Sequence, residues 1–195
     1  MIGTSSVAAL APLDYRYALD ASMAVLGGKA APTVLCNAPE LACEVRQRIP
    51  SWGGVERAGA ALWVEPLVDT WRAELATLRS ALPGDAPLAV IASRPLARLL
   101  PERHMWGGRP LGLQPSGIGY LRGALLRAGF RLETVYGIHS ALAIWLSLLG
   151  RQAERWGYPN VGDRLHFAAR LRYCTSGPLA ALSTVALLIA RKGCG

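Results

Sequence analysis

The sequence predicts an α/β fold in which helices cover both faces of a mostly parallel sheet. Short apolar runs of the kind that form buried strands alternate with amphipathic stretches long enough for helices. A helix stops at Gly129 and turns through Phe130 directly into the strand Arg131–Tyr136. The chain closes on one more apolar strand, Ser183–Arg191, which can pair antiparallel with its neighbour. Together these features predict a three-layer sandwich of helix, sheet and helix.

The length and composition predict a single domain. A chain of 195 residues with 52% hydrophobic content can bury one core of good size. We therefore expect one domain over residues 1–195, with an N-terminal helical extension over 1–30 and a helical excursion over 140–178.

The charge of the chain has two explanations. The formal net charge is +8, and the basic residues are nineteen arginines with only Lys29 and Lys192. Such a balance can attract an anionic partner. The preference for arginine, together with many alanines, leucines, glycines and prolines, also fits a nucleotide-composition bias of the source genome. Charge alone does not indicate a nucleic-acid-binding protein, although it does not rule one out.

The remaining composition predicts a cytoplasmic protein without a metal site or a membrane span, and a contact with a membrane surface stays open as a second option. The four cysteines form no C-x-x-C pair, so we expect reduced, mostly buried thiols and no metal site. No basic residue precedes the first short apolar run, which argues against a secretory leader. The run Ile138–Gly150 is too short to cross a bilayer, and glycine, proline and hydroxyl residues interrupt Tyr173–Ala190.

The first half of the chain alternates helices and strands. Gly27 and Gly28 close the first helix, and Pro39 stands at the first position of the second. In the third helix, apolar residues follow one face while Glu74 lies on the opposite, polar face. The predicted elements in chain order are a helix Asp14–Leu26, a strand Pro32–Asn37, a helix Glu40–Ile49, a strand Ala58–Val64, a helix Leu67–Leu82 and a strand Pro87–Ala92.

The second half begins with a segment, Arg94–Pro115, that is irregular or weakly helical because proline, glycine and arginine dominate it. Ser116 can cap the helix that ends at Gly129. The predicted elements that follow are the strand Arg131–Tyr136, a helix Ser140–Arg155, a partly helical stretch Arg164–Tyr173 and the strand Ser183–Arg191.

Three of these blocks, in this order, resemble the class I S-adenosylmethionine-dependent methyltransferase fold. They are the strand–helix–turn–strand block Gly59–Ser93, the sequence LLRAGFRLETVYG around Gly129, and the final STVALLIARK. The resemblance covers Gly59 to Lys192. It implies a Rossmann-like sheet whose last strand is antiparallel, with S-adenosylmethionine as cofactor and a methyl-transfer reaction.

The first third of the chain departs from the family pattern. Family members open with a strand that enters a glycine-rich loop, where the backbone and a helix N-terminus receive the cofactor. The corresponding strand here, Thr33–Cys36, is followed by Asn37, Ala38 and Pro39, with no G-x-G. Too few residues separate the start of the following helix from the next strand to hold the family's usual second and third strand–helix units. The sequence therefore predicts a diverged, shortened member with a reduced N-terminal half.

The resemblance implies cofactor contacts at Asn37, Ala38 and Glu65. These residues follow predicted strands, and ligands of open α/β sheets bind beyond strand carboxyl ends. Glu65 can also orient a substrate or act as a base, which makes it the one candidate catalytic residue. Two alternatives stay open: Glu65 can instead interact with the dipole of the next helix, and Asn37 can bond its own backbone in a turn.

Arg94 and His104 are candidate substrate-binding residues. They lie in a segment that also carries Arg98, Arg103 and Arg109, and such a loop can bind a carboxylate or phosphate. The alternative is a solvated surface loop.

Other polar residues provide no catalytic set. His139 and His166 have no nucleophile or metal-ligand partner at suitable spacing, so we expect ordinary surface or core residues. The apolar face with Trp145 and Trp156 is either core or a partner surface. Arg151 and Arg155 lie one turn apart and can meet nucleic-acid phosphates, but no RNA-binding aromatic motif accompanies them.

Two functions follow from these residues. The first is an S-adenosylmethionine-dependent methyltransferase that acts on a small molecule by proximity and orientation. The second is a non-catalytic module with the same fold that serves as a homo-oligomer or binds a protein partner. Fold alone does not decide between them.

Overall fold

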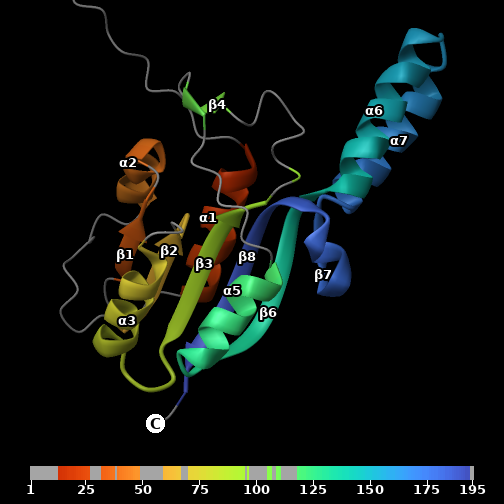
Figure 1. Ribbon diagram of the computed structural model, residues 1–195. Helices are drawn as coiled ribbons and strands as arrows, with labels where there is room; N and C mark the ends of the chain where they lie inside the picture. The colour runs from red at the N-terminus through yellow and green to blue at the C-terminus, as the bar shows by residue number, and fades with distance from the viewer. Residues whose placement is uncertain are drawn as a thin grey trace, which may run out of the picture.

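The computed structural model describes residues 13–26, 32–37, 39–48, 59–66, 70–94, 96, 105–106, 109–110 and 118–193. They form a six-stranded sheet in the order β1-β2-β3-β8-β6-β7, with helices on both faces (Figure 1). The strands are β1 Thr33–Cys36, β2 Ala61–Val64, β3 Pro87–Ser93, β6 Phe130–Ser140, β7 Cys174–Ser176 and β8 Ser183–Lys192. Two further short strands, β4 Met105–Trp106 and β5 Arg109–Pro110, pair with each other in the segment predicted to be irregular.

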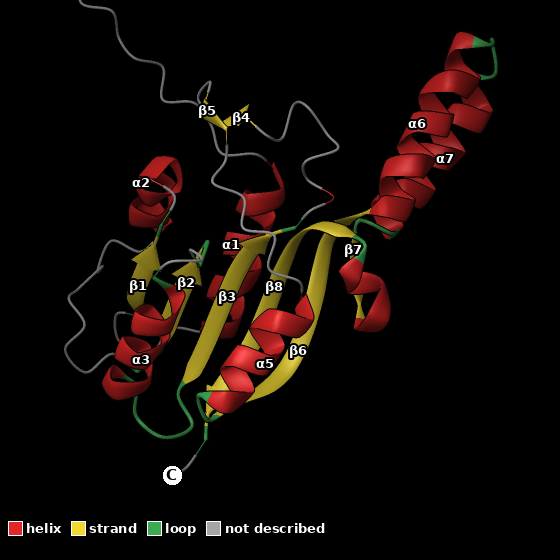
Figure 2. Ribbon diagram, in the orientation of Figure 1, coloured by secondary structure: helices red, strands yellow, loops and turns green. Residues whose placement is uncertain are grey.

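The predicted three-layer α/β architecture is confirmed. The helices are α1 Leu13–Leu26, α2 Pro39–Arg48, α3 Trp71–Ala81, α5 Ile118–Arg127, α6 Ala141–Arg155 and α7 Pro159–Leu171, with a 3-10 helix η2 at Gly177–Ala181. One face of the sheet packs on α1 and on Val45 of α2, and the opposite face packs on α3 and α5. Figure 2 shows these two layers of helices on either side of the strands.

Strand β8 lies at the centre of the sheet because it is apolar on both faces. Val185, Leu187 and Ile189 point into the core below α1, whereas Ala186 and Leu188 point into the core below α3 and α5. The strand pairs antiparallel with β3 and with β6, as the sequence predicted. Strands β1, β2, β3 and β6 run in one direction, and β7 and β8 run in the other.

Two predicted element boundaries, the end of β6 and the start of α7, differ most from the structure. Strand β6 runs on to Ser140 rather than ending at Tyr136, because its second half pairs with β7, a strand that was not predicted. Helix α7 begins at Pro159, not Arg164, since proline suits a first helical turn. The helix predicted over Leu67–Leu82 is observed as α3 from Trp71, and residues 67–69 lie outside the described residues.

The turn at Gly129 confirms the most specific sequence signal. Gly129 has φ of +82°, the left-handed conformation that glycine adopts without steric cost, and it ends α5 just before β6. Ser140 caps α6 at the other end of β6, with its Oγ accepting a hydrogen bond from the Ala143 amide at 3.2 Å.

Candidate functional site

The polar residues that follow the three parallel strands lie on one edge of the sheet. Asn37 follows β1, Glu65 follows β2 and Arg94 follows β3, and these strands pair in parallel register. The backbone continues the ladder into this edge, since the Asn37 amide donates to Val64 and the Glu65 amide donates to Ile91. This is the carboxyl edge where open α/β sheets bind ligands. We call it the rim.

Glu65 is buried within the rim and joins three elements. Its Oε1 accepts hydrogen bonds from the Tyr15 hydroxyl of α1 at 2.6 Å and from the Ser93 amide at 2.7 Å. Its Oε2 accepts from the Ser93 Oγ at 2.8 Å. Burial raises the pKa of the Glu65 carboxyl above its ordinary value of 4.5, and the hydrogen bonds from Tyr15 and Ser93 oppose that rise.

The backbone at Glu65 is also unusual. Its φ is 53°, a left-handed conformation that non-glycine residues rarely adopt and that costs about 1 kcal/mol or more. The hydrogen bonds to Tyr15 and Ser93 hold the residue in this conformation. Strained backbone of this kind persists where the surrounding structure holds it, and it is common at functional sites.

Asn37 belongs to a second polar cluster, centred on Glu74. The Asn37 amide nitrogen donates to the two Glu74 carboxylate oxygens at 3.1 and 2.9 Å. The indole nitrogen of the buried Trp63 donates to the same carboxylate at 2.6 Å, and the Thr70 hydroxyl donates to it as well. Glu74 was predicted on the polar outer face of its helix, but its carboxylate faces β1 and β2. Its place in the first turn of α3 was the only sequence signal for this role.

Arg94 turns away from solvent toward the strand β8 side of the rim. Its backbone amide donates to Thr184 at 2.8 Å and its Nη2 donates to the Ala181 carbonyl of η2 at 2.8 Å. The guanidinium is mostly buried, and this burial lowers its pKa. The predicted sites at Ala38 and His104 lie outside the described residues, as do Arg98 and Arg103.

A cleft of about 870 Å³ opens where α1, the end of β6 and the α6–α7 pair meet. The His139 ring stacks on Tyr173 at 5.0 Å between centroids, and Tyr17 of α1 meets Tyr173 edge-on at 5.7 Å. Opposite them, His166 of α7 faces the cleft and bonds Glu154 through its Nε2 at 3.1 Å. Residues of five elements or their ends thus share one surface. The lining residues that carry polar groups are Tyr17, His139, Ser147, Asp163, His166, Arg170, Tyr173 and Cys174.

Sequence reasoning treated His139 and His166 separately and did not predict this cleft. The two residues are far apart in the sequence, and only the pairing of β6 with β7 and the return of α7 bring them together. His139 has φ of 54°, so like Glu65 it holds a strained conformation near a strand end. In the described part of the chain, no three histidine, cysteine or acidic side chains gather as metal ligands.

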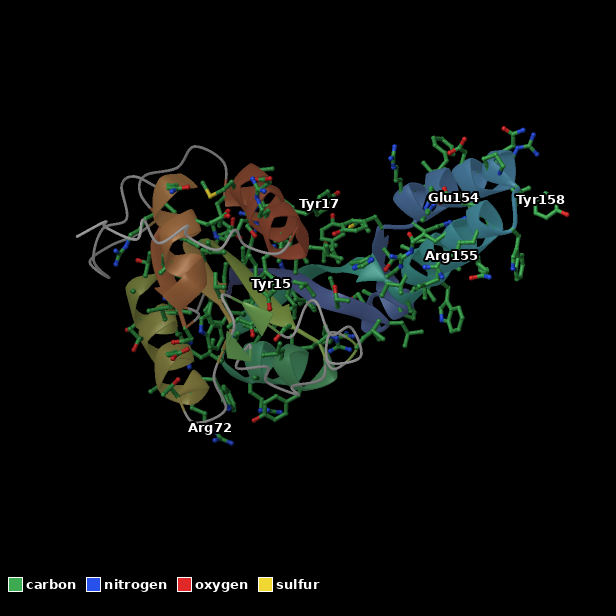
Figure 3. All side chains as sticks on the ribbon, turned by 90° about the horizontal axis from the view of Figure 1, so that it is seen from above. Tyr15, Tyr17, Arg72, Glu154, Arg155 and Tyr158 are labelled. Atoms are coloured by element: carbon green, nitrogen blue, oxygen red, sulfur yellow. The ribbon has the colours of Figure 1, made fainter. Side chains whose placement is uncertain are left out.

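Helix α1 contacts both the cleft and the buried Glu65 carboxylate. Tyr15 bonds Glu65 and Tyr17 lines the cleft, and both belong to the first turns of α1. Figure 3, which looks down on the rim, labels both tyrosines on this helix. A ligand in the cleft therefore lies beside the helix that closes over Glu65.

Comparison with solved structures supports the predicted fold, whereas comparison of sequences found no relative. No family model matches the chain, and no curated protein matches its sequence. An S-adenosylmethionine-dependent methyltransferase from Thermotoga maritima superposes with a TM-score of 0.51 at 13% identity, over 91% of this chain and 89% of that one. The chain thus has a class I methyltransferase-like fold.

Two weaker likenesses have TM-scores of 0.47. One is a cyclopropane synthase from Mycobacterium tuberculosis, at 15% identity over 91% of this chain and 84% of that one. The other is a protein from Listeria monocytogenes assigned as an S-adenosylmethionine-dependent methyltransferase, at 10% identity over 92% and 98%. Identities this low carry no information about substrate.

Proposed function

We propose that this chain is an S-adenosylmethionine-dependent methyltransferase whose cofactor binds at the rim and whose small-molecule substrate binds in the cleft. The observation that supports it most is the position of the cleft on a methyltransferase-like fold. Tyr17 of α1 lines the cleft, and Tyr15 of the same helix bonds Glu65 at the rim. When bound, S-adenosylmethionine supplies a methyl group to an acceptor, which then loses a proton.

The rim residues fit such a ligand in a specific way. The Glu65 carboxylate already accepts three hydrogen bonds, two on Oε1 and one on Oε2, so a ligand hydroxyl can donate to the remaining lone pair of Oε2 or exchange with the Tyr15 hydroxyl. This exchange substitutes one hydroxyl-to-carboxylate bond for another. The Asn37 amide nitrogen is engaged by Glu74, which leaves its carbonyl oxygen as the acceptor for a ligand.

The cleft residues supply orientation and a base. The methyl-transfer reaction needs an aligned acceptor more than a nucleophilic side chain. The stacked rings of His139 and Tyr173 can hold a flat or apolar substrate. The imidazoles of His139 and His166 can accept the proton that an amine or hydroxyl acceptor releases.

Calorimetric titration with S-adenosylmethionine and with its demethylated product tests the cofactor. We expect binding heat and a rise in melting temperature with both ligands. The variant Glu65→Gln should weaken both effects, whereas Arg122→Gln, on the exposed outer side of α5, should not. Absence of heat and of a thermal shift at millimolar ligand would contradict the proposal and favour the non-catalytic alternative, an oligomerisation or partner-binding module.

A further inference from the structure

The helices α6 and α7 form an antiparallel hairpin that projects from the edge of the sheet. In Figures 1 and 3 the pair extends away from the rest of the molecule, with Tyr158 at its far end. The turn consists of Trp156, Gly157 and Tyr158, and Gly157 has φ of +84°. Much of the surface of the hairpin therefore faces solvent.

Small residues make the contact between the two helices. Ala143, Gly150 and Ala153 of α6 are buried, as are Gly162 and Ala169 of α7. A Cβ atom at Gly150 would lie 2.9 Å from the His166 ring, and one at Gly162 would lie 2.6 Å from Glu154 Cγ. The two helices thus approach closely at Gly150 and Gly162.

Four large apolar side chains, three of α6 and Trp156 in the turn that follows it, point outward along one stripe. These four residues recur at steps of three, four and seven positions along the chain, which places them on one side of the helix and its continuation. Their exposed fractions are 51% for Leu142, 64% for Trp145, 51% for Leu149 and 69% for Trp156. On α7, Phe167 and Leu171 are exposed as well. Side chains of this size are usually buried, so the stripe has the properties of a contact surface.

Arginines border this apolar stripe. A groove of about 460 Å³ on α6 is lined by Trp145, Leu148, Leu149, Arg151, Gln152 and Arg155. Residues 141–172 carry five arginines and two acidic residues, and one of these acids, Glu154, pairs with His166. No ion pair joins the five arginines to any described residue. They are Arg151, Arg155, Arg164, Arg170 and Arg172, and all five are exposed.

This combination of charge and apolar surface distinguishes among partners. A second copy that docked face to face would bring the arginine borders of both hairpins together, with few acids to offset them. A nucleic acid would bind the arginines but leave the tryptophans and leucines in water. An anionic lipid surface accepts both, because arginines reach headgroup phosphates while tryptophan, tyrosine and leucine enter the boundary with the acyl chains.

We propose that the α6–α7 hairpin binds the surface of membranes that contain anionic phospholipids. The stripe of Trp145, Leu149 and Trp156 enters the headgroup boundary, and Arg151 and Arg155 contact phosphates beside it. The 15 residues of α6 extend about 22 Å, less than the roughly 30 Å of a hydrocarbon core, so the helix lies in the interface. No described helix has the length and apolar character to cross a membrane. This inference is independent of the proposed methyltransferase activity.

Vesicle flotation with the full chain tests the proposal. We expect the protein to float with phosphatidylcholine vesicles that contain about 30 mol% phosphatidylglycerol, and much less with pure phosphatidylcholine. Binding should fall as salt is raised, and tryptophan emission should shift to shorter wavelength on binding. Equal binding to both vesicle types, or none to either, would overturn the proposal.

Matched variants separate the hairpin from the rest of the surface. Leu149→Ser on the hairpin should weaken vesicle binding by roughly tenfold, whereas Leu126→Ser on α5, at the same exposed fraction of 51%, should leave it unchanged. Arg155→Gln should weaken binding more than Arg122→Gln on α5. Circular dichroism of each variant shows that the fold is retained. Equal losses for hairpin and α5 variants would count against the proposal.

Two further results would overturn it. One is a stable dimer in light scattering without lipid that Leu149→Ser dissociates, combined with no flotation. The other is retention of a DNA or RNA duplex that Arg155→Gln abolishes, again with no flotation.

Discussion

The rim and the hairpin differ in which side chains they bury and which they expose. At the rim, polar side chains turn inward: Glu65 and Glu74 sit among hydroxyl, amide and indole donors. In the hairpin, large apolar side chains turn outward and small ones fill the interior. A buried polar group needs a partner in the protein, whereas an exposed apolar group needs one outside it. We therefore expect substitutions in the sheet to reduce stability most, and the proposed contact with a membrane surface to depend on the hairpin.

The largest expected contrast compares a leucine of the sheet with one of the hairpin. Leu188→Ala in β8 should lower the free energy of unfolding by about 2–5 kcal/mol, because it leaves a cavity between buried strands. Leu149→Ala should change the same free energy by no more than about 0.5 kcal/mol, since half of its side chain is already in water. Urea unfolding measures both. Similar losses would contradict the division between the two regions.

The next effect concerns the partner of the buried carboxylate. Tyr15→Phe removes the hydroxyl that donates to Glu65 and should cost about 1.5–3 kcal/mol, the range for hydrogen bonds to charged groups. Tyr17→Phe provides a matched control on the same helix, because Tyr17 is exposed and contacts Tyr173 through its ring. Equal stability of the two variants in urea would show that the Tyr15 hydroxyl does not support Glu65.

A smaller effect tests the close contact within the hairpin. Gly162→Ala places a methyl group 2.6 Å from Glu154 and should destabilise the hairpin by about 1–3 kcal/mol. Gly123→Ala in α5 meets only the end of the Arg127 side chain, at 3.3 Å, so the better helix propensity of alanine should offset that contact. Hydrogen exchange of the α6 and α7 amides provides the measurement. Unchanged protection in Gly162→Ala would contradict tight packing of the two helices.

The last prediction concerns how the free energy of unfolding changes with pH. Because burial raises the pKa of Glu65, the folded state holds its proton more tightly than the unfolded state does. This contribution to stability is complete below about pH 4.5 and is lost as pH rises through the raised pKa. Glu65→Gln cannot titrate, so the variant should gain stability relative to wild type as pH increases, by at most about 1.4 kcal/mol per pH unit. Parallel stability curves between pH 4 and 8 would rule this out.

The elements of the sheet could be predicted because each follows from a local pattern. Gly129 needs a left-handed turn whatever surrounds it, and the uncharged run of β8 must be buried on both faces. Strand β7 could not be predicted, since Cys174–Ser176 is short and carries no apolar alternation. It forms only because β6 extends far enough to pair with it.

The sequence by itself determined the α/β class, the order of the longer helices and strands, and the place of Asn37, Glu65 and Arg94 at strand ends. Periodicity and turn residues act over a few neighbouring positions, so these features could be predicted locally. Only the tertiary structure decided what those side chains contact. Tyr15 reaches Glu65 across 50 residues of sequence, and His139 and His166 meet at one cleft through the hairpin's return. It also decided that Trp145 and Trp156 face outward, because the small residues Gly150 and Gly162 occupy the helix contact. Such contacts depend on how distant segments pack, which local patterns do not encode.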